Sequence, residues 1–226
     1  MASSSYPTRT HTTTRSLTYS YTHIQPTSPS NPYILFLHGF PSSSHDWYHQ
    51  IIYLSTLGYG IIAPDLLGYG GTSKPLSMHL YKLKDMASDL HEILSLHSIS
   101  ASHKAIGVGH DWGSLILSRL VNYYPELFKK LAFLDVGLWR RQGLRFLGIF
   151  LFMDEEGSAE LLDTNPESVM SIYYTLDDDT GKEYMGATDG FRKWLEGGMI
   201  APHPDFVTGE EVEYFKKLIL APTRGI

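Results

Sequence analysis

The sequence has 226 residues, of which 42% are hydrophobic and 19% charged, and it contains no cysteine. This length is enough for one sizeable globular domain, or for a domain with a large insertion. The absence of cysteine excludes a disulfide framework, a thiol nucleophile and a thiolate zinc site, and it fits a reducing compartment. The net charge of −6 argues against a nucleic-acid partner. No apolar run approaches the roughly 18 to 20 residues that a membrane span needs.

Charge divides the chain into two regions. Residues 1–137 hold 8 acidic and 9 basic side chains, a net charge of +1. Residues 138–226 hold 16 acidic and 9 basic side chains, a net charge of −7. We therefore place a domain boundary near Gly137.

The N-terminal segment is polar, and its Ser, Thr and Arg content is compatible with a transit peptide. Residues 17–21 alternate like a strand, however, and the segment lacks the apolar core of a secretory signal. We therefore favour a polar arm that leads into a first strand, in a cytoplasmic protein.

From Tyr33 onward, short apolar runs alternate with stretches of helical periodicity, which is the pattern of βαβ units. The sequence predicts strands at 33–37, 60–63, 105–108 and 131–134, and helices at 44–57, 82–98 and 112–124. Continuous apolar strands of this kind are typical of a parallel sheet that helices cover on both faces. After Gly137 the strand pattern ends. Residues 155–163 and 208–220 have helical spacing, so we expect a separate helical region over 138–226.

Three loops after predicted strands have unusual sequences, and ligands of such sheets bind beside the carboxyl ends of the strands. They are His38-Gly39-Phe40-Pro41, the Gly-rich segment 64–75, and Gly109-His110-Asp111-Trp112-Gly113. In the last, Gly-x-Asp-x-Gly between strand and helix is the pattern of a nucleophile elbow with Asp in place of Ser. The helix N-terminus favours an ionised Asp111. The alternative role for Asp111 is a plain helix N-cap.

A dinucleotide-binding turn is a rival interpretation of the same segment. Gly107, Gly109 and Gly113 lie between strand and helix, and Asp135 ends the next strand, where an acidic residue would bind a ribose. The glycine spacing is one residue too long, however, and Asp111 would place a negative charge where the pyrophosphate binds. The histidines form no cluster with the spacing of metal ligands. We therefore expect no metal and no organic cofactor.

The three loops, in this order, resemble those of the α/β-hydrolase-fold epoxide hydrolases, over roughly residues 15–226. The resemblance implies an α/β-hydrolase fold, with the N-terminal part of the core and its mostly parallel sheet in 1–137 and an incomplete helical cap in 138–226. It implies that Asp111 is the nucleophile, which attacks an epoxide to give an alkyl-enzyme ester. It also implies that the backbone amides of Phe40 and Trp112 form the oxyanion hole. The substrate would be a small apolar epoxide.

Haloalkane dehalogenases share the aspartate elbow and the Trp that follows it, and they are the nearest alternative. They usually bind halide with that Trp and with an Asn at the position of Phe40. The Phe therefore favours an epoxide, although other halide donors would still permit dehalogenation.

The histidine base and its orienting acid normally follow the nucleophile in this fold. Among the histidines of the sequence, only His203 follows Asp111, and it lies between two prolines in the helical region. Asp135 is a candidate for the orienting acid. We therefore expect that the base and the last strands of the sheet are missing, and that turnover stops at the ester. A non-catalytic binding protein or a truncated relic is the remaining alternative.

Overall fold

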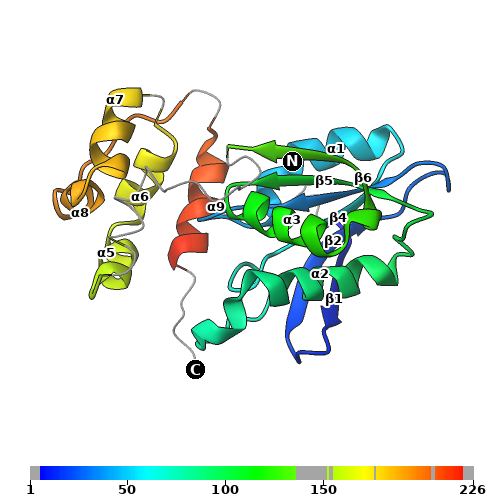
Figure 1. The fold of residues 1–226 in the computed structure, drawn as a ribbon. Helices are drawn as coiled ribbons and strands as arrows, with labels where there is room; N and C mark the ends of the chain where they lie inside the picture. Colours follow the sequence, from blue (N-terminus) through cyan, green and yellow to red (C-terminus); the bar gives the residue numbers. More distant parts are fainter. Residues whose placement is uncertain (1–5, 136–151, 153–154, 176, 205–206, 221–226) are drawn as a thin grey trace. The chain divides into compact units, whose positions relative to one another are not determined.

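The computed structural model describes residues 6–135, 152, 155–175, 177–204 and 207–220, and it divides into two compact units, Met1–Arg140 and Arg141–Ile226 (Figure 1). The described part of the first unit contains a six-stranded mixed sheet with the strand order β1-β2-β4-β3-β5-β6. Its strands are β1 (Thr8–Thr12), β2 (Thr18–Ile24), β3 (Tyr33–Leu37), β4 (Gly60–Pro64), β5 (Ala105–His110) and β6 (Phe128–Leu134).

Strands β4, β3, β5 and β6 run parallel, as the continuous apolar runs predict. Strand β2 is antiparallel to β4, and β1 is antiparallel to β2. The sequence predicts a polar arm before Leu17, and for Thr8–Thr12 this prediction is wrong because these residues form β1. Most of β1 is exposed, so the strand carries no alternation of apolar and polar residues by which the sequence could reveal it.

Helices cover both faces of this sheet. They are α1 (Tyr48–Thr56), α2 (Leu83–Leu96) and α3 (Trp112–Tyr123), with short 3₁₀ turns at Ser44–Trp47, Met78–Tyr81 and Pro125–Leu127. Alternate residues of β3 point to opposite faces. Leu35 and Leu37 pack in the cluster that contains α2 and α3 residues, whereas Ile34 and Phe36 pack with Ile51 of α1. Figure 1 shows α1 on one side of the strands and α2 and α3 on the other.

A buried ion pair joins the β1–β2 turn to α2. Arg15 Nη1 donates to Asp89 Oδ2 at 2.6 Å, and the Tyr19 hydroxyl donates to the same oxygen at 2.9 Å. Asp89 is fully buried, and burial raises the pKa of its carboxyl group above its usual value. A buried carboxylate is retained only where partners compensate its lost hydration. Arg15, one of the two arginines of the polar arm, is therefore part of the folded core.

The second unit is helical in its described residues. It contains α5 (Ser158–Thr164), α6 (Pro166–Tyr173), α7 (Asp178–Gly181), a π-helical turn at Lys182–Gly186, α8 (Gly190–Glu196) and α9 (Gly209–Leu220). It has its own core, in which Phe152, Met170, Phe191 and Trp194 are buried together. No helix in the described part of the chain combines the length and the apolar character that a membrane crossing requires.

Candidate active site

Asp111 lies in a sharp turn between the end of β5 at His110 and the start of α3 at Trp112 (Figure 1). Its backbone has φ 50° and ψ −120°. Residues other than glycine rarely adopt this conformation, which costs on the order of 1–3 kcal/mol. Two backbone hydrogen bonds hold the turn. The Asp111 N–H donates to Leu134 O at 3.3 Å, and its carbonyl accepts the Ser114 N–H at 2.9 Å.

Glycines leave the space that this turn requires. A Cβ atom on Gly113 would lie 2.1 Å from the carbonyl oxygen of Leu37, and one on Gly109 would lie 2.8 Å from the carbonyl oxygen of Gly113. On the other side of the turn, a Cβ on Gly39 would lie 2.5 Å from the Asp111 side chain. Gly113 is therefore required by close contact with the end of β3 and the loop after it, and Gly109 by close contact with the start of α3.

The loop after β3 holds the Asp111 carboxylate directly. The Phe40 backbone N–H donates to Asp111 Oδ1 at 2.8 Å. The peptide bond from Phe40 to Pro41 is cis. Asp111 is half-buried, and Trp112, the next residue, begins α3. The three residues assigned to the site from sequence thus lie together at the carboxyl ends of β3 and β5, with Phe40 and Asp111 in hydrogen-bond contact.

His38, in the loop after β3, is fully buried, and both of its ring nitrogens are hydrogen-bonded. The Leu66 N–H donates to Nε2 at 2.9 Å, so Nε2 is unprotonated, and Nδ1 donates to Gly39 O at 2.8 Å. Burial lowers the pKa of His38 below its usual value. The ring is therefore neutral and positions the loop, and it does not act as a base.

The Gly-rich segment 64–75 is organised by the Asp65 carboxylate. Its Oδ1 accepts the Ser44 N–H at 2.9 Å, and its Oδ2 accepts the Gly71 N–H at 2.8 Å. Gly70 has φ +48°, and a Cβ there would lie 2.1 Å from Asp65 Oδ2. Both carboxylate oxygens accept backbone N–H groups of the chain itself, so this loop is a structural turn.

Tyr69 lies in the same segment, and no sequence pattern predicts a role for it. Its ring packs edge-on against His38 at 5.3 Å and against Phe40 at 6.5 Å between ring centroids. Burial and the charge of Asp111 raise the pKa of Tyr69 well above its usual value. A neutral phenol therefore lies close to the Asp111 carboxylate. The Gly-Tyr-Gly motif alone marks a turn and does not show which way the ring points.

The two other candidate groups lie in different units. Asp135 follows β6, directly after Leu134, which accepts the Asp111 N–H; it is exposed and has φ 69°. His203 belongs to the second unit. Among the described residues, no group of three or more His, Asp or Glu could hold a metal ion.

Replacing Ser114 with Ala is expected to lower the free energy of unfolding by about 1 kcal/mol. The Ser114 hydroxyl is buried at the elbow and donates to Gly109 O at 2.8 Å. Its matched control is Ser118→Ala, one turn further along α3, because the buried Ser118 hydroxyl has no hydrogen-bond partner among the described residues. Denaturant unfolding should show a loss for S114A and no loss for S118A. Equal losses would mean that the Ser114 hydrogen bond does not stabilise the elbow.

Comparison with known proteins identifies the family. The family model described as alpha/beta hydrolase fold matches residues 32–156, more than half of the chain. The sequence is 42% identical over 194 residues to epoxide hydrolase srdG of Neurospora crassa, which covers 82% of this chain and 51% of that protein. It is 33% identical over 199 residues to epoxide hydrolase 2 of Siraitia grosvenorii, covering 82% of this chain and 61% of the relative.

A solved structure of a similar protein has the same fold. The crystal structure of epoxide hydrolase A from Mycobacterium thermoresistibile superposes with a TM-score of 0.79 at 25% identity, covering 96% of this chain and 71% of that one. The chain spans between half and two thirds of the two curated relatives above. The chain is therefore a member of the α/β-hydrolase fold family, and within that family it is similar to the epoxide hydrolases.

Proposed function

We propose that this protein is an epoxide hydrolase-like protein in which Asp111 is the nucleophile that forms an alkyl-enzyme ester. The observation that carries the proposal is the hydrogen bond from the Phe40 N–H to Asp111 Oδ1, at 2.8 Å, in a strained turn at the carboxyl ends of the strands. A plain helix N-cap would bond to the first turn of its own helix. Asp111 makes no such side-chain bond to α3. Its carboxylate is aligned instead by the loop after β3.

The proposed first step follows from this alignment. Asp111 Oδ2 attacks one ring carbon of the epoxide, a C–O bond of the ring breaks, and the ring oxygen keeps the electron pair and takes up a proton. The product is a hydroxyalkyl ester in which Oδ1 becomes the carbonyl oxygen. A carboxylate is suited to such a displacement at saturated carbon.

A complete turnover would need a second step, in which water attacks the ester carbonyl, the acyl C–O bond breaks, the diol leaves and the Asp111 carboxylate is regenerated. The Phe40 N–H already points at Oδ1, and we assign the Trp112 N–H as the second donor of the oxyanion hole. The developing charge on Oδ1 would then meet preorganised donors. The small apolar epoxide as substrate, the second unit as a helical cap and a cytoplasmic location belong to the same proposal.

Incubation of the 226-residue chain with an aromatic epoxide such as styrene oxide tests the proposal. The expected product is a chain heavier by the full mass of the epoxide, added once, with the label on the peptide that contains Asp111. Since His203 is the one histidine after Asp111 in this sequence, we expect the ester to accumulate. Intact-mass and peptide mass spectrometry measure both. Sustained diol release would contradict the accumulation, and a label elsewhere would contradict the nucleophile assignment.

A haloalkane serves as the control substrate. Attack on a haloalkane adds only the alkyl group and releases one halide ion per label, so the two chemistries differ in added mass and in halide. Phe40 stands where dehalogenases usually have a halide-binding Asn, and we therefore expect no halide release. Halide release without epoxide labelling would favour a dehalogenase.

A further inference from the structure

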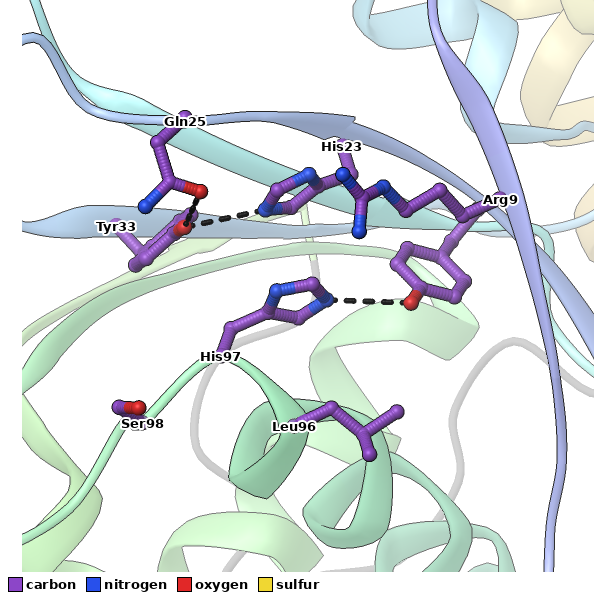
Figure 2. Close-up of a pocket in the computed structure, with 8 residues that line it drawn as sticks. Arg9, His23, Gln25, Tyr33, Leu96, His97 and Ser98 are labelled. Atoms are coloured by element: carbon purple, nitrogen blue, oxygen red, sulfur yellow. Dashed lines mark hydrogen bonds between the residues drawn. The ribbon is translucent and has the colours of Figure 1, made fainter.

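A polar pocket lies beside strands β1 and β2 at one edge of the sheet, whereas Asp111 follows β5 near the other edge. It has a volume of about 450 Å³, and the side chains that matter here are Arg9, Tyr21, His23, Tyr33 and His97 (Figure 2). Tyr33 begins β3, and β3 is parallel to β5, with Ile34 opposite Ile106. Tyr33 is therefore level with the start of β5, and Arg9 and Tyr21 lie on β1 and β2, which β4 and β3 separate from β5 in the sheet. The pocket is separate from the proposed active site.

Strand register brings the basic side chains of the pocket together. Arg9 of β1 is directly opposite Tyr21 of β2, and His23 is two residues further along the same face. His97, at the C-terminal end of α2, stacks on His23 with ring centroids 4.0 Å apart and an angle of 19° between the rings. Figure 2 shows Arg9 and the two imidazoles facing the same space.

The hydrogen bonds fix the state of the His23 ring. Tyr33 Oη donates to Gln25 Oε1 at 3.0 Å, so the bond of 3.1 Å between Tyr33 Oη and His23 Nε2 is donated by the imidazole. His23 Nδ1 is then the nitrogen that takes up a proton when the ring becomes charged. His97 Nε2 is hydrogen-bonded to Tyr21 Oη at 3.2 Å.

The pocket has positive and protonatable groups without a matching carboxylate. None of the described residues that line it is acidic. Burial lowers the pKa of His23, and burial together with His23 and Arg9 lowers the pKa of His97 to about 4. Both stacked rings are therefore neutral at pH 7. A bound anion would offset the repulsion between Arg9 and two charged imidazoles, whereas a bound cation would increase it.

We propose that this pocket binds a small oxyanion, a sulfate, phosphate or carboxylate group, between Arg9 and the stacked rings of His23 and His97. Arg9 supplies a permanent charge and forked donors, the geometry suited to an oxyanion. The imidazoles supply further donors when protonated. The aromatic rings of Tyr21 and Tyr33 would face any apolar part that the anion carries.

Binding should strengthen as pH falls. A bound anion favours the charged imidazoles and so raises their pKa values towards the usual value, which means that binding takes up protons. The affinity should therefore rise between about pH 7 and pH 5, and the increase should level off near pH 4, where His97 is charged even without the anion. Sulfate is a suitable probe because its charge does not change over this range.

Titration of the full 226-residue chain with sulfate, followed by the NMR signals of the His23 and His97 Cε1–H protons, tests the proposal. We expect saturable shifts of both signals, with higher affinity at the lower pH. Arg9→Gln should weaken binding about tenfold, the effect of losing a charge-assisted hydrogen bond. Arg9 is exposed, so this change should leave the fold intact. The matched control is Arg119→Gln, because Arg119 is exposed on α3 and is not part of the pocket.

A parallel titration with benzenesulfonate distinguishes the possible sources of the anion. Tighter binding of benzenesulfonate would indicate an organic anion with an aromatic part, and equal binding would indicate a free inorganic oxyanion; either result supports the site. The proposal is wrong if neither anion moves the two histidine signals. It is also wrong if Arg119→Gln weakens binding as much as Arg9→Gln does, since the effect would then come from net charge alone.

Discussion

Asp111→Asn is expected to lower the rate of covalent labelling by an aromatic epoxide by about 10³-fold or more. The amide oxygen of Asn can still accept the Phe40 N–H that now bonds to Asp111 Oδ1 at 2.8 Å, so the elbow should keep its shape. The amide is a far weaker nucleophile than a carboxylate, and the displacement depends on that nucleophile. The measurement is the rate at which the epoxide mass appears on the intact chain.

Two controls make this result specific. Glu126→Gln removes an exposed carboxylate just before β6, at the end of the sheet away from the elbow, and should leave the labelling rate within about twofold. The far-ultraviolet circular dichroism and melting temperature of D111N should match those of the unmodified chain. Labelling of D111N at the original rate would show that another carboxylate reacts with the epoxide. Asp111 would then be a structural turn residue.

Sequence patterns predict the part of the sheet that is buried on both faces. The strand at Tyr33–Leu37 is observed with the predicted bounds, and the helices predicted at 82–98 and 112–124 are observed at Leu83–Leu96 and Trp112–Tyr123. These elements have a strong apolar periodicity because each of them fills the core. The exposed strand Thr8–Thr12 fills no core, and it was missed for that reason.

The chemistry of the site is only partly visible in the sequence. Asp111 stands out because an acidic residue between two glycines, at a strand-to-helix junction, needs an explanation. Its hydrogen bond from Phe40 joins loops 71 residues apart, and it follows from the parallel pairing of β3 with β5. Tyr69 was missed because the direction of a side chain in a glycine-rich turn depends on three-dimensional packing.

The sequence does not predict the pocket around Arg9, His23 and His97, for a related reason. Arg9 and His97 are 88 positions apart in the chain, and they come together only through the β1–β2 hairpin and the end of α2. Single histidines spread along a sequence carry no spacing signal, whereas their stacking in the structure does indicate a site. Pockets formed by long-range pairing are thus less visible in a sequence than motifs within one loop.

Gly113→Ala is expected to destabilise the first unit by about 3 kcal/mol or more. The added methyl group would lie 2.1 Å from the carbonyl oxygen of Leu37 and 2.6 Å from that of His38. Neither oxygen can move easily, because Leu37 pairs with Gly109 in the sheet. The free energy of unfolding in denaturant measures the loss. A lower labelling rate should accompany it, since the strain would displace the loop that holds Asp111.

Two further glycines give a graded test of the same argument. Gly109→Ala should cost less than Gly113→Ala, because its Cβ would meet backbone atoms at 2.8 Å and not at 2.1 Å. Gly181→Ala should cost nothing, because Gly181 is in helical conformation and no atom lies within 4 Å of its added Cβ. If all three variants unfold alike, close backbone contact does not explain the glycines of the elbow. A loss in the free energy of unfolding that decreases in the order G113A, G109A, G181A would show that close packing at the elbow requires glycine on either side of Asp111.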